Sequence, residues 1–487
     1  MQNQSLKPRK FSAMCATLLT AYTVIFYSST VYGQIDIDSI LPPFSKFQRP
    51  AQPTTIALSP DSSQLVLGTN SGYLATISTI TGKVIWKTRI SQGYVKHATF
   101  SLNGKQLYLG EQSADGFIFC YDVSKPRKPR LLWQYRLADD VGTSIPENPD
   151  DYYAWIQYPG PYRIANTKQG DLIVAAVHSW YEDGKTLIKS QLYRFDAKTG
   201  KPIWKFPSER PLPMIIRWFD YSHDGRTIAF VCDKYSIDQP IGNLKPGSLY
   251  VINGETGKIR WGHTFKVFTP YFDQVTFWRG VAVSPDGKSI GTTTNDGRAF
   301  IFSEEKLIWQ EDLATPIEIS GVPITATLGT VGATDDFIIF ITGDSFVPYD
   351  LQKDVKRPPM PHPKGLTLFG YQWNGKKSWQ WKLENVPQGL RIDLSGKYAA
   401  IPISIYGHKN TEMPNGVSIF DLTAEGGGLD KYLRTHRLAG QIPYDMIAFS
   451  QNGRQIAVVE TVSSPGGKEQ RGKNQVHIIT PEIEDTN

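Results

Sequence analysis

Short runs of alternating apolar and polar residues, separated by polar turns, occupy most of the chain. Pairs of such runs flank a turn in which Ser is followed two residues later by Asp or Asn, as in IALSPDSSQLVLG from residue 56, VAVSPDGKSIGTT from residue 281 and IAFSQNGRQIAVV from residue 447. Asp, Asn and Gly adopt the backbone conformations of tight turns, and alternation at period two places one face of a strand against a core. The pattern predicts pairs of short β-strands joined by hairpins.

This pair of strands recurs eight times, in close or degenerate copies. The turn centres fall near residues 61, 103, 169, 224, 286, 335, 395 and 452, so each unit spans roughly 40 to 65 residues. Repeats of this length with several short strands each are typical of β-propeller blades. The sequence therefore predicts an all-β fold, an eight-bladed β-propeller of four-stranded antiparallel blades.

A T-G-K turn followed by a Trp forms the second half of the clearest units. It occurs as TGKVIW from residue 81, TGKPIW from residue 199 and TGKIRW from residue 256. In the first unit this order predicts strands at 54–58, up to 68, at 73–78 and around Trp86. A Trp on the outermost strand can cover the seam to the next blade and bury roughly 150 to 250 Å². Six positions are predicted to share this role: Trp86, Trp133, Trp204, Trp261, Trp309 and either Trp379 or Trp381.

The last unit is predicted to lack its own outer strand, because residues 474–480 supply its third strand and few residues follow. A ring with an unpaired edge would expose backbone hydrogen-bonding groups. Residues 34–40, QIDIDSI, or the stretch just after them, are therefore predicted to supply the missing strand and to close the propeller.

The unit DAKTGKPIW, from residue 196, resembles the tryptophan-docking motif of the quinoprotein alcohol dehydrogenase-like propellers, which are eight-bladed. The Ser-Pro-Asp-Gly turns also resemble those of WD-repeat and related bacterial propellers. The resemblance covers most of residues 50–480 and implies the fold, whereas a function does not follow from a shared fold.

The quinoprotein resemblance implies pyrroloquinoline quinone, gripped by an adjacent Cys-Cys pair, and a calcium ion beside a catalytic Asp at the ring centre. The chain has no Cys-Cys dipeptide, and Cys120 and Cys232 lie in different units. No calcium ligand or catalytic Asp can be matched residue by residue, and no haem, metalloprotease, hydrolase or P-loop motif occurs. We expect no catalytic residue, cofactor or metal. A dehydrogenase with an atypical site, using pyrroloquinoline quinone and calcium, is the alternative.

Residues 1–33 have the order of a secretory signal. Lys7, Arg9 and Lys10 precede an apolar run, and small residues follow it before Gln34. The expected domains are a signal peptide at 1–33, or alternatively a membrane anchor, and a single propeller at 34–487. An exported location, periplasmic or extracellular, is therefore predicted, with membrane contact only if the N-terminal segment is uncleaved.

Charge does not select a partner for the exported chain. Without residues 1–33 it has 49 Lys and Arg against 46 Asp and Glu, a net charge of +3 with both signs scattered. This balance argues against binding to nucleic acid or to anionic lipid. Cys120 and Cys232 lie in apolar runs and are predicted to be free and buried.

The long insertions of the predicted units gather on one face of the ring. In a four-stranded blade, the connection between the second and third strands and the connection to the next blade lie on the same face. The insertions sort to this face and lie near residues 138–161, 178, 232, 263–272, 343–365, 404 and 461. Loops on a rigid scaffold commonly carry binding residues, so we expect this loop-rich face to recognise a ligand.

The aromatic side chains of these loops are the candidate contacts, because Tyr and Trp offer much contact area for few rotamers fixed. We expect them to bind a protein partner, or alternatively a glycan; packing of the same rings over the end of the ring is the structural alternative. The candidate residues are Tyr152, Tyr153, Trp155, Tyr158, Trp180, Tyr181, Tyr235 and Tyr271. Trp218, Trp278 and Arg279, near the first strands of two units, are alternatively expected at the mouth of the channel, and for Trp218 packing in the core is favoured.

Overall fold

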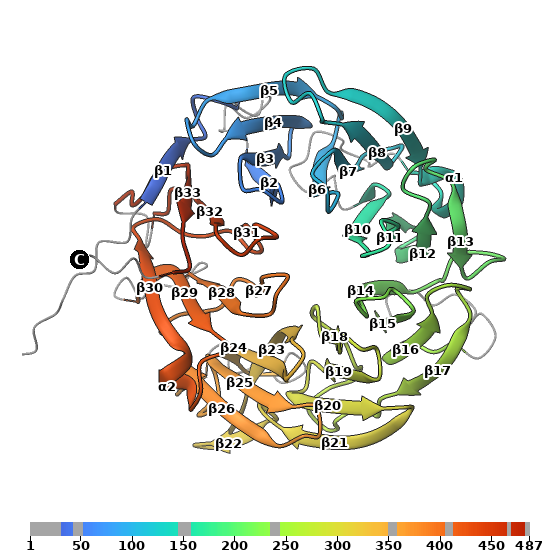
Figure 1. Ribbon diagram of the computed structural model, residues 1–487. Helices are drawn as coiled ribbons and strands as arrows, with labels where there is room; N and C mark the ends of the chain where they lie inside the picture. Colours follow the sequence, from blue (N-terminus) through green and yellow to red (C-terminus); the bar gives the residue numbers. More distant parts are fainter. Residues whose placement is uncertain are drawn as a thin grey trace, which may run out of the picture.

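Eight antiparallel sheets surround a central axis like the blades of a propeller (Figure 1). The computed structural model describes residues 31–41, 52–144, 157–233, 244–348, 358–404, 413–464 and 469–482. Seven sheets have four strands, and the sixth along the chain has a short fifth strand. The predicted fold class and number of blades are confirmed.

The first four blades each use four consecutive strands. Their bounds are β2 (Pro53–Leu58), β3 (Gln64–Thr69), β4 (Tyr73–Ser78) and β5 (Val84–Arg89) in blade 1; β6 (Tyr94–Phe100), β7 (Gln106–Gln112), β8 (Phe117–Asp122) and β9 (Arg130–Arg136) in blade 2; β10 (Gly160–Asn166), β11 (Leu172–Glu182), β12 (Lys185–Phe195) and β13 (Pro202–Phe206) in blade 3; and β14 (Ile215–Tyr221), β15 (Thr227–Asp233), β16 (Ser248–Asn253) and β17 (Ile259–Thr264) in blade 4.

The last four blades depart more from the repeat. Their bounds are β18 (Val281–Val283), β19 (Ser289–Thr293), β20 (Arg298–Ser303) and β21 (Lys306–Asp312) in blade 5; β22 (Ile317–Ile319), β23 (Val322–Ala333), β24 (Phe337–Phe346), β25 (Thr367–Gln372) and β26 (Lys377–Lys382) in blade 6; β27 (Arg391–Ile392), β28 (Tyr398–Ile403), β29 (Asn415–Asp421) and β30 (Tyr432–Leu438) in blade 7; and β31 (Ile447–Phe449), β32 (Ile456–Glu460), β33 (Gln475–Ile479) and the N-terminal β1 (Val31–Asp36) in blade 8. Two one-turn helices, α1 (Ala138–Val141) and α2 (Gly428–Lys431), lie in the described connections.

The N-terminal strand closes the ring, as predicted. β1 pairs antiparallel with β33, and Ile35 lies opposite Val476. The expected end of the export signal at residue 33 falls inside this strand, so cleavage there would leave Gln34 to Asp36 to make the pairing. Neither helix in the described part of the chain has the length or apolar character needed to span a membrane.

The hydrophobic core lies between the blades. Eight clusters of buried side chains each join two neighbouring sheets, and together they occupy all eight seams. At the closing seam, Ile35, Ile37, Ile40 and Leu41 pack with side chains of blades 1 and 8. Cys120 and Cys232 are free and buried in two of the other seams, as predicted.

The repeated turn and the repeated Trp act on each other across a seam. Trp133 of blade 2 lies against Gly200 of the T-G-K turn in blade 3, where a Cβ would come within 2.5 Å of the indole. The indole Nε1 donates a hydrogen bond to the Ala197 carbonyl at 2.9 Å. Trp204 contacts Gly257 of blade 4 in the same way and donates to the Gly254 carbonyl at 2.8 Å. The turn therefore needs Gly both for its positive φ and as a flat docking surface.

Blade 6 offers two candidates for the seam position, and both face blade 7. Trp379 has the register of the other seam residues, pairs with Gly370 and is 3% exposed. Trp381 stacks on Tyr432 of β30, with ring centroids 4.6 Å apart. The sequence alternative thus resolves into two Trp residues that share one seam.

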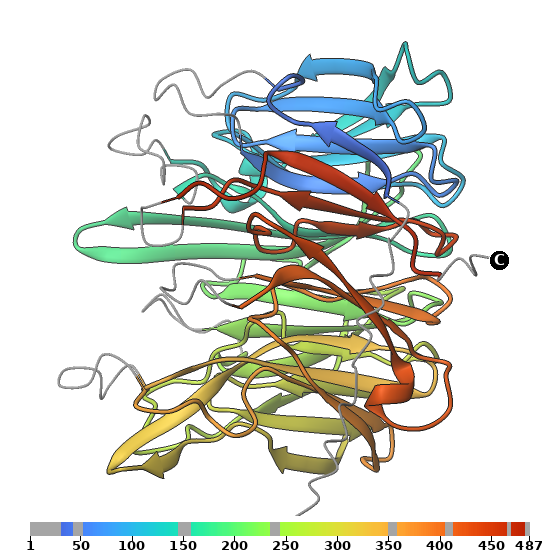
Figure 2. The same cartoon turned by 90° about the vertical axis from the view of Figure 1, so that its left-hand side faces the viewer.

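The two faces of the ring differ in the parts that the structure describes. The hairpin of β11 and β12 joins second and third strands, and it extends well beyond the sheets on one side of the disc (Figure 2). The α2 connection projects on the opposite side. For this hairpin, the predicted assignment of long insertions to the loop-rich face is confirmed.

Candidate functional site

The innermost strands of all eight blades line a central channel with a cavity volume of about 830 Å³. Its entrance on the loop-rich face lies where these first strands begin. The group of charged and aromatic side chains that runs from this entrance into the channel is called the channel mouth: Lys96, Arg163, Trp218, Asp220, Trp278, Arg279, Arg391, Tyr444 and Asp445. Six blades, namely blades 2, 3, 4, 5, 7 and 8, contribute its charged residues, so the site exists only once the ring is closed.

One carboxylate holds two guanidinium groups at the mouth. Asp445 forms ion pairs with Arg279, at 2.5 Å, and with Arg391. Burial opposes ionisation of Asp445, but the two adjacent guanidinium groups prevail and lower its pKa to about 2. The carboxylate is therefore ionised at neutral pH and links blades 5, 7 and 8.

Aromatic rings fix the orientation of the same arginines. The guanidinium of Arg279 lies 4.5 Å from the ring centroids of both Trp218 and Tyr444. The guanidinium of Arg163 also lies 4.5 Å from the ring centroid of Trp218, and it forms an ion pair with Asp220 at 3.3 Å. Arg279 also has a φ of +52°, a backbone conformation that residues other than Gly rarely adopt. A strained backbone conformation is kept where surrounding contacts hold it in place, and such residues are common at functional sites.

Two basic side chains in the channel wall beside these arginines, Lys96 and His97, have lowered pKa values. Burial is the main cause that lowers the pKa of Lys96 to about 8, and Arg279 lowers it further while Asp445 acts in the opposite direction. Burial, reinforced by Lys96, lowers the pKa of His97 to about 3, so this imidazole is neutral at physiological pH. The channel wall thus holds partly buried basic groups that lose or withhold a proton more readily than free side chains do.

The implied quinoprotein groups do not fit these residues. Calcium requires six to eight oxygen ligands, commonly carboxylates. The mouth carboxylates Asp220 and Asp445 instead bind arginines, and no group of three or more His, Cys, Asp or Glu suited to a metal occurs among the described residues. The cysteines that would grip a quinone lie in separate seams, so no catalytic step through quinone or calcium is derived.

The sequence-predicted aromatic residues are only partly brought together. Tyr152, Tyr153, Trp155 and Tyr235 lie outside the described residues. Tyr158 is half-buried, and Tyr271 stacks on Phe268 with ring centroids 6.2 Å apart. Both rings are therefore partly removed from solvent.

The two aromatics of the β11–β12 hairpin behave differently from each other. Trp180 is half-buried and stacks on His178, with ring centroids 4.5 Å apart. Tyr181 is 62% exposed. It shares this property with Trp278 of the channel mouth, which is 53% exposed. They are the only large aromatic side chains so exposed in the described part of the chain, and both belong to the loop-rich face.

Only part of the channel mouth could be predicted from the sequence. Trp218, Trp278 and Arg279 do line it, and Trp218 is at the same time a core residue with 8% exposure. Lys96, Arg163, Asp220, Arg391, Tyr444 and Asp445 were not predicted. A usable signal existed for the basic residues, because Lys96, Arg163 and Arg391 all lie in first strands, which line the channel of a propeller.

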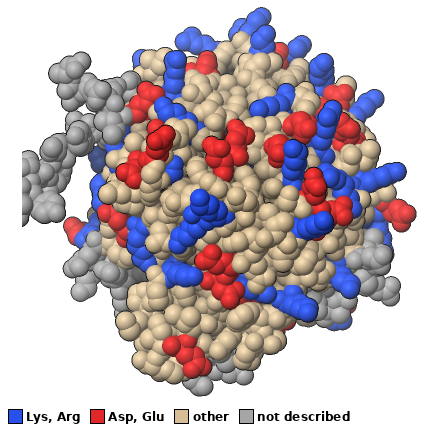
Figure 3. Space-filling view, turned by 60° about the horizontal axis from the view of Figure 1, so that its bottom comes forward, with Lys and Arg blue, Asp and Glu red and all other residues tan. Residues whose placement is uncertain are grey.

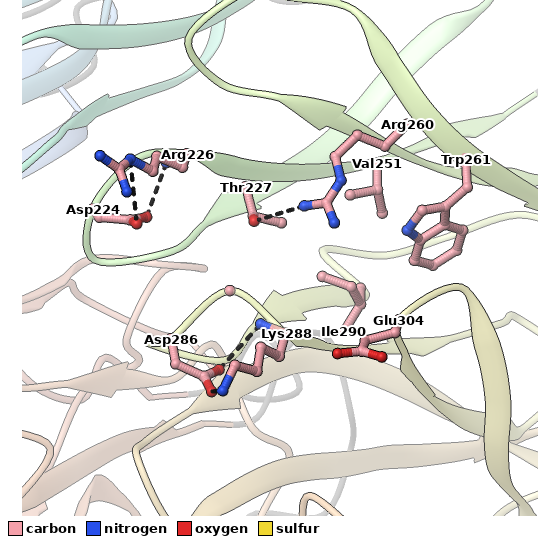
Figure 4. Close-up of a pocket in the computed structure, with 11 residues that line it drawn as sticks. Asp224, Arg226, Thr227, Val251, Arg260, Trp261, Asp286, Lys288, Ile290 and Glu304 are labelled. Atoms are coloured by element: carbon pink, nitrogen blue, oxygen red, sulfur yellow. Dashed lines mark hydrogen bonds and ion pairs between the residues drawn. The ribbon is translucent and has the colours of Figure 1, made fainter.

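A second, smaller cavity of about 260 Å³ lies between blades 4 and 5 on the short-turn face (Figure 4). Arg226 and Asp224 line one side, Lys288 and Asp286 the other, with Trp261 at the far end. Each cation lies beside a carboxylate of its own turn. The groove is a seam between two hairpin turns, and its charges balance locally.

Neither a protein-family model nor a curated protein sequence matches this chain. Solved structures do share its fold. Sqt1 of Saccharomyces cerevisiae superposes with a TM-score of 0.52 at 10% identity, over 93% of this chain and 99% of Sqt1. The C-terminal WD40 domain of Sif2 gives a TM-score of 0.53 at 11% identity, over 93% of this chain and 98% of that domain.

The chain is a β-propeller similar in fold to WD40 proteins. The expected resemblance to WD-repeat propellers is confirmed at the level of fold, and the closer relation to quinoproteins stays a prediction. At 10 to 11% identity the likeness says nothing of partners. The function of this WD40-like propeller has to be argued from its own surfaces.

Proposed function

We propose that this WD40-like propeller is an exported, non-catalytic scaffold that binds a protein partner in the cell envelope or outside the cell. The binding surface is the loop-rich face, which carries the β11–β12 hairpin and the channel mouth. The observation that carries the proposal is the one-sided exposure of large aromatic rings, Tyr181 at 62% and Trp278 at 53%.

Exposed Tyr and Trp side chains are the kind that dominate binding energy at protein interfaces. The most exposed hydrophobic side chains of the short-turn face are aliphatic, such as Ile80 in the turn between β4 and β5. The strands of the β11–β12 hairpin are paired as far as Glu182 and Lys185, so little ordering entropy is lost when this hairpin binds a partner. The same exposed rings could also contact a glycan, which is the alternative ligand of this face.

The face seen in Figure 3 has mixed charge: among its described residues, Lys and Arg lie interspersed with Asp and Glu, without a large area of one sign. Mixed charge of this kind does not attract nucleic acid strongly.

Site-specific photo-crosslinking tests the binding face. A photoreactive phenylalanine analogue replaces Tyr181 in one variant and Ile80 in a matched control, and both are expressed in the native host. We expect a discrete crosslinked protein from position 181 that competes with unmodified propeller, and none from position 80. A partner captured from position 80 alone would assign the interface to the opposite face and overturn the proposal.

Export is tested separately. We expect fractionation to recover the protein outside the cytoplasm, with a mature N-terminus near Gln34 by mass spectrometry. A full-length chain retained in the cytoplasm would contradict the exported location without deciding the binding face.

A further inference from the structure

The two most exposed large hydrophobic side chains of the described chain both lie on the short-turn face. Ile80 is 80% exposed in the turn between β4 and β5 of blade 1, and Leu429 is 72% exposed in α2 of blade 7. Each belongs to the connection between the third and fourth strands of its blade. A single exposed Ile or Leu is common on protein surfaces, so exposure alone assigns no function. The place of these two side chains in the ring is more informative.

Blade 8 separates the two side chains. Its core side chains pack with blade 1 in one seam and with blade 7 in the other. Its fourth strand is β1, in which Val31 lies opposite Ile479 at the end of the third strand, β33. Third strands end at the short-turn face, so the chain enters the propeller there, between α2 and the β4–β5 turn (Figure 1). We call this part of the short-turn face, from Ile80 through the start of β1 to Leu429, the entry edge.

The sequence that precedes β1 is suited to a lipid bilayer. Residues 11–29 carry no charged side chain, and three basic residues lie before them. As an export signal or as an anchor, a segment of this composition lies in a membrane while it is attached to the chain. Only residues 28–30 separate Tyr27, the last aromatic residue of the apolar run, from Val31. At no more than about 3.6 Å per residue, they keep the start of β1 within about 15 Å of Tyr27.

The charges beside the two aliphatic side chains do not favour anionic lipid. Lys83 and Lys87 follow the first of them in exposed positions, whereas Glu425 and Asp430 are exposed beside the second. Attraction of one group to a charged bilayer is therefore opposed by the other. An apolar contact remains, since an aliphatic side chain gains by leaving water for the interfacial layer. Two side chains do not hold a folded domain on a membrane by themselves, so they orient a domain that is already tethered.

We propose that the entry edge lies on the surface of a zwitterionic bilayer while residues 1–30 are attached, with Ile80 and Leu429 in the interfacial layer. The inference rests on the exported location in the proposed function and adds the orientation of the propeller. The loop-rich face lies on the opposite side of the disc from α2 and is left open to the proposed protein partner (Figure 2). Cleavage of the N-terminal segment removes the tether and with it the contact.

Quenching of a fluorophore by labelled lipid tests the contact. The full-length chain is made by cell-free synthesis with phosphatidylcholine nanodiscs, where no signal peptidase cuts it. A single Cys that carries the environment-sensitive fluorophore NBD replaces Ile80 in one variant and Leu429 in another. The matched control is Ile259→Cys, a 43% exposed aliphatic position at the start of β17, on the short-turn side of blade 4 and across the ring from blade 8. A fourth variant, Tyr181→Cys, reports on the loop-rich face.

The native cysteines do not interfere with this labelling. Cys15 is changed to Ser in every variant, and Cys120 and Cys232 are buried. The fluorophore is therefore confined to the introduced position. Circular dichroism establishes that each variant is folded.

We expect doxyl-labelled phosphatidylcholine in the nanodiscs to quench the fluorophore at positions 80 and 429 at least about twofold, because these positions lie in the interfacial layer. Emission from positions 259 and 181 should change by less than about a tenth, because water surrounds them. Quenching at none of the four positions, or equal quenching at 80, 429 and 259, would overturn the proposal. Quenching at position 181 instead would place the loop-rich face on the lipid and would overturn it as well.

Photo-crosslinking in the native host separates a lipid contact from a protein contact at the entry edge. A photoreactive phenylalanine analogue at position 429 should capture no discrete protein. A discrete crosslinked protein that competes with unmodified propeller would mean that a protein covers this edge, and would overturn the lipid contact. Crosslinking from position 181 does not depend on the nanodisc result. Absent quenching with retained crosslinking at 181 therefore refutes the orientation alone, and the reverse result refutes the binding face alone.

Discussion

The outer rim of the ring and the wall of its channel follow opposite rules. At the rim, blades 2, 3 and 5 place a Trp against a Gly of the next blade. A Cβ at that Gly would lie only 2.5 to 2.8 Å from the indole, so a larger residue does not fit. At the channel mouth six of the eight blades contribute residues that differ from blade to blade, and most of these residues are charged. Repetition therefore marks the parts that hold the ring together, and departure from repetition marks the parts available for recognition.

Closure of the rim should have the largest effect on stability. Deletion of residues 31–41 removes strand β1 and four buried aliphatic side chains, Ile35, Ile37, Ile40 and Leu41. At about 2 kcal/mol for each side chain, the loss approaches the 5 to 15 kcal/mol that stabilises a typical domain. We expect circular dichroism to show a lost or strongly lowered thermal transition, partly restored by a synthetic peptide of residues 31–41. An unchanged transition would show that the ring closes without this strand.

A rim Trp and a mouth Trp should differ sharply. Trp204→Ala removes an indole from the seam of blades 3 and 4 and should lower the free energy of unfolding by about 3 kcal/mol. Trp278→Ala removes a ring that is 53% exposed and should cost less than about 1 kcal/mol. Urea unfolding of both variants measures the contrast. Equal losses would contradict the assignment of separate roles.

The docking function of the rim glycine can be separated from its turn function. Gly170 and Gly200 both have positive φ, +90° and +69°, but only a Cβ at Gly200 would meet an indole; nothing lies within 4 Å at Gly170. Each change to Ala should cost about 1 kcal/mol for the backbone conformation. Gly200→Ala should cost at least about 1 kcal/mol more, because the Cβ displaces Trp133. Equal losses of unfolding free energy in the two variants, measured by urea unfolding, would mean that Trp133 moves aside without cost.

The channel wall should give the smallest effect, a dependence on pH. His97 has a pKa of about 3 in the fold, mainly through burial, against 6.5 in its ordinary state. As pH falls from 6.5 towards 4, the unfolded chain binds a proton that the fold rejects, so the free energy of unfolding decreases. The full shift would amount to about 2.7 kcal/mol between pH 7 and pH 4.5, and solvent contact of His97 reduces it, so replacement by Gln should remove at least about 1 kcal/mol of the decrease.

Other groups also titrate in this range, His436 and Asp233 among them, so the test is the difference between wild type and His97→Gln. His436, with a pKa lowered to about 4 mainly by burial, adds to the decrease. Asp233, whose pKa burial raises to about 6, acts in the opposite direction. An identical pH profile for the two proteins in urea unfolding would contradict a neutral, buried His97.

The rim could be predicted from the sequence because its physics is local and repeated. The T-G-K turn sets a hairpin, the following Trp lies at a fixed register, and the N-terminal segment 34–40 was the natural donor for the open blade. The fifth strand of blade 6, β22, was not predicted, since three residues of weak alternation carry no signal. The sharing of one seam by Trp379 and Trp381 also needed the sheet register.

The channel mouth could be predicted only in part because its residues meet through ring closure. Lys96 and Asp445 are separated by most of the chain, and no spacing rule relates them. Their proximity depends on every blade between them keeping its width and twist. The predicted loop aromatics Tyr152, Tyr153, Trp155 and Tyr235 stay a prediction, and among the described ones Tyr181 is the most exposed.

The separation of stability at the rim from recognition at the loop-rich face is tested most directly by measuring both properties on Trp204→Ala and Trp278→Ala. Unfolding in urea gives the first property, and crosslinking yield from position 181, per folded molecule, gives the second. Trp204→Ala should lose about 3 kcal/mol of stability and keep its crosslinking yield, whereas Trp278→Ala should keep its stability and lose yield. The reverse pattern, or the same loss of both properties in both variants, would contradict the account.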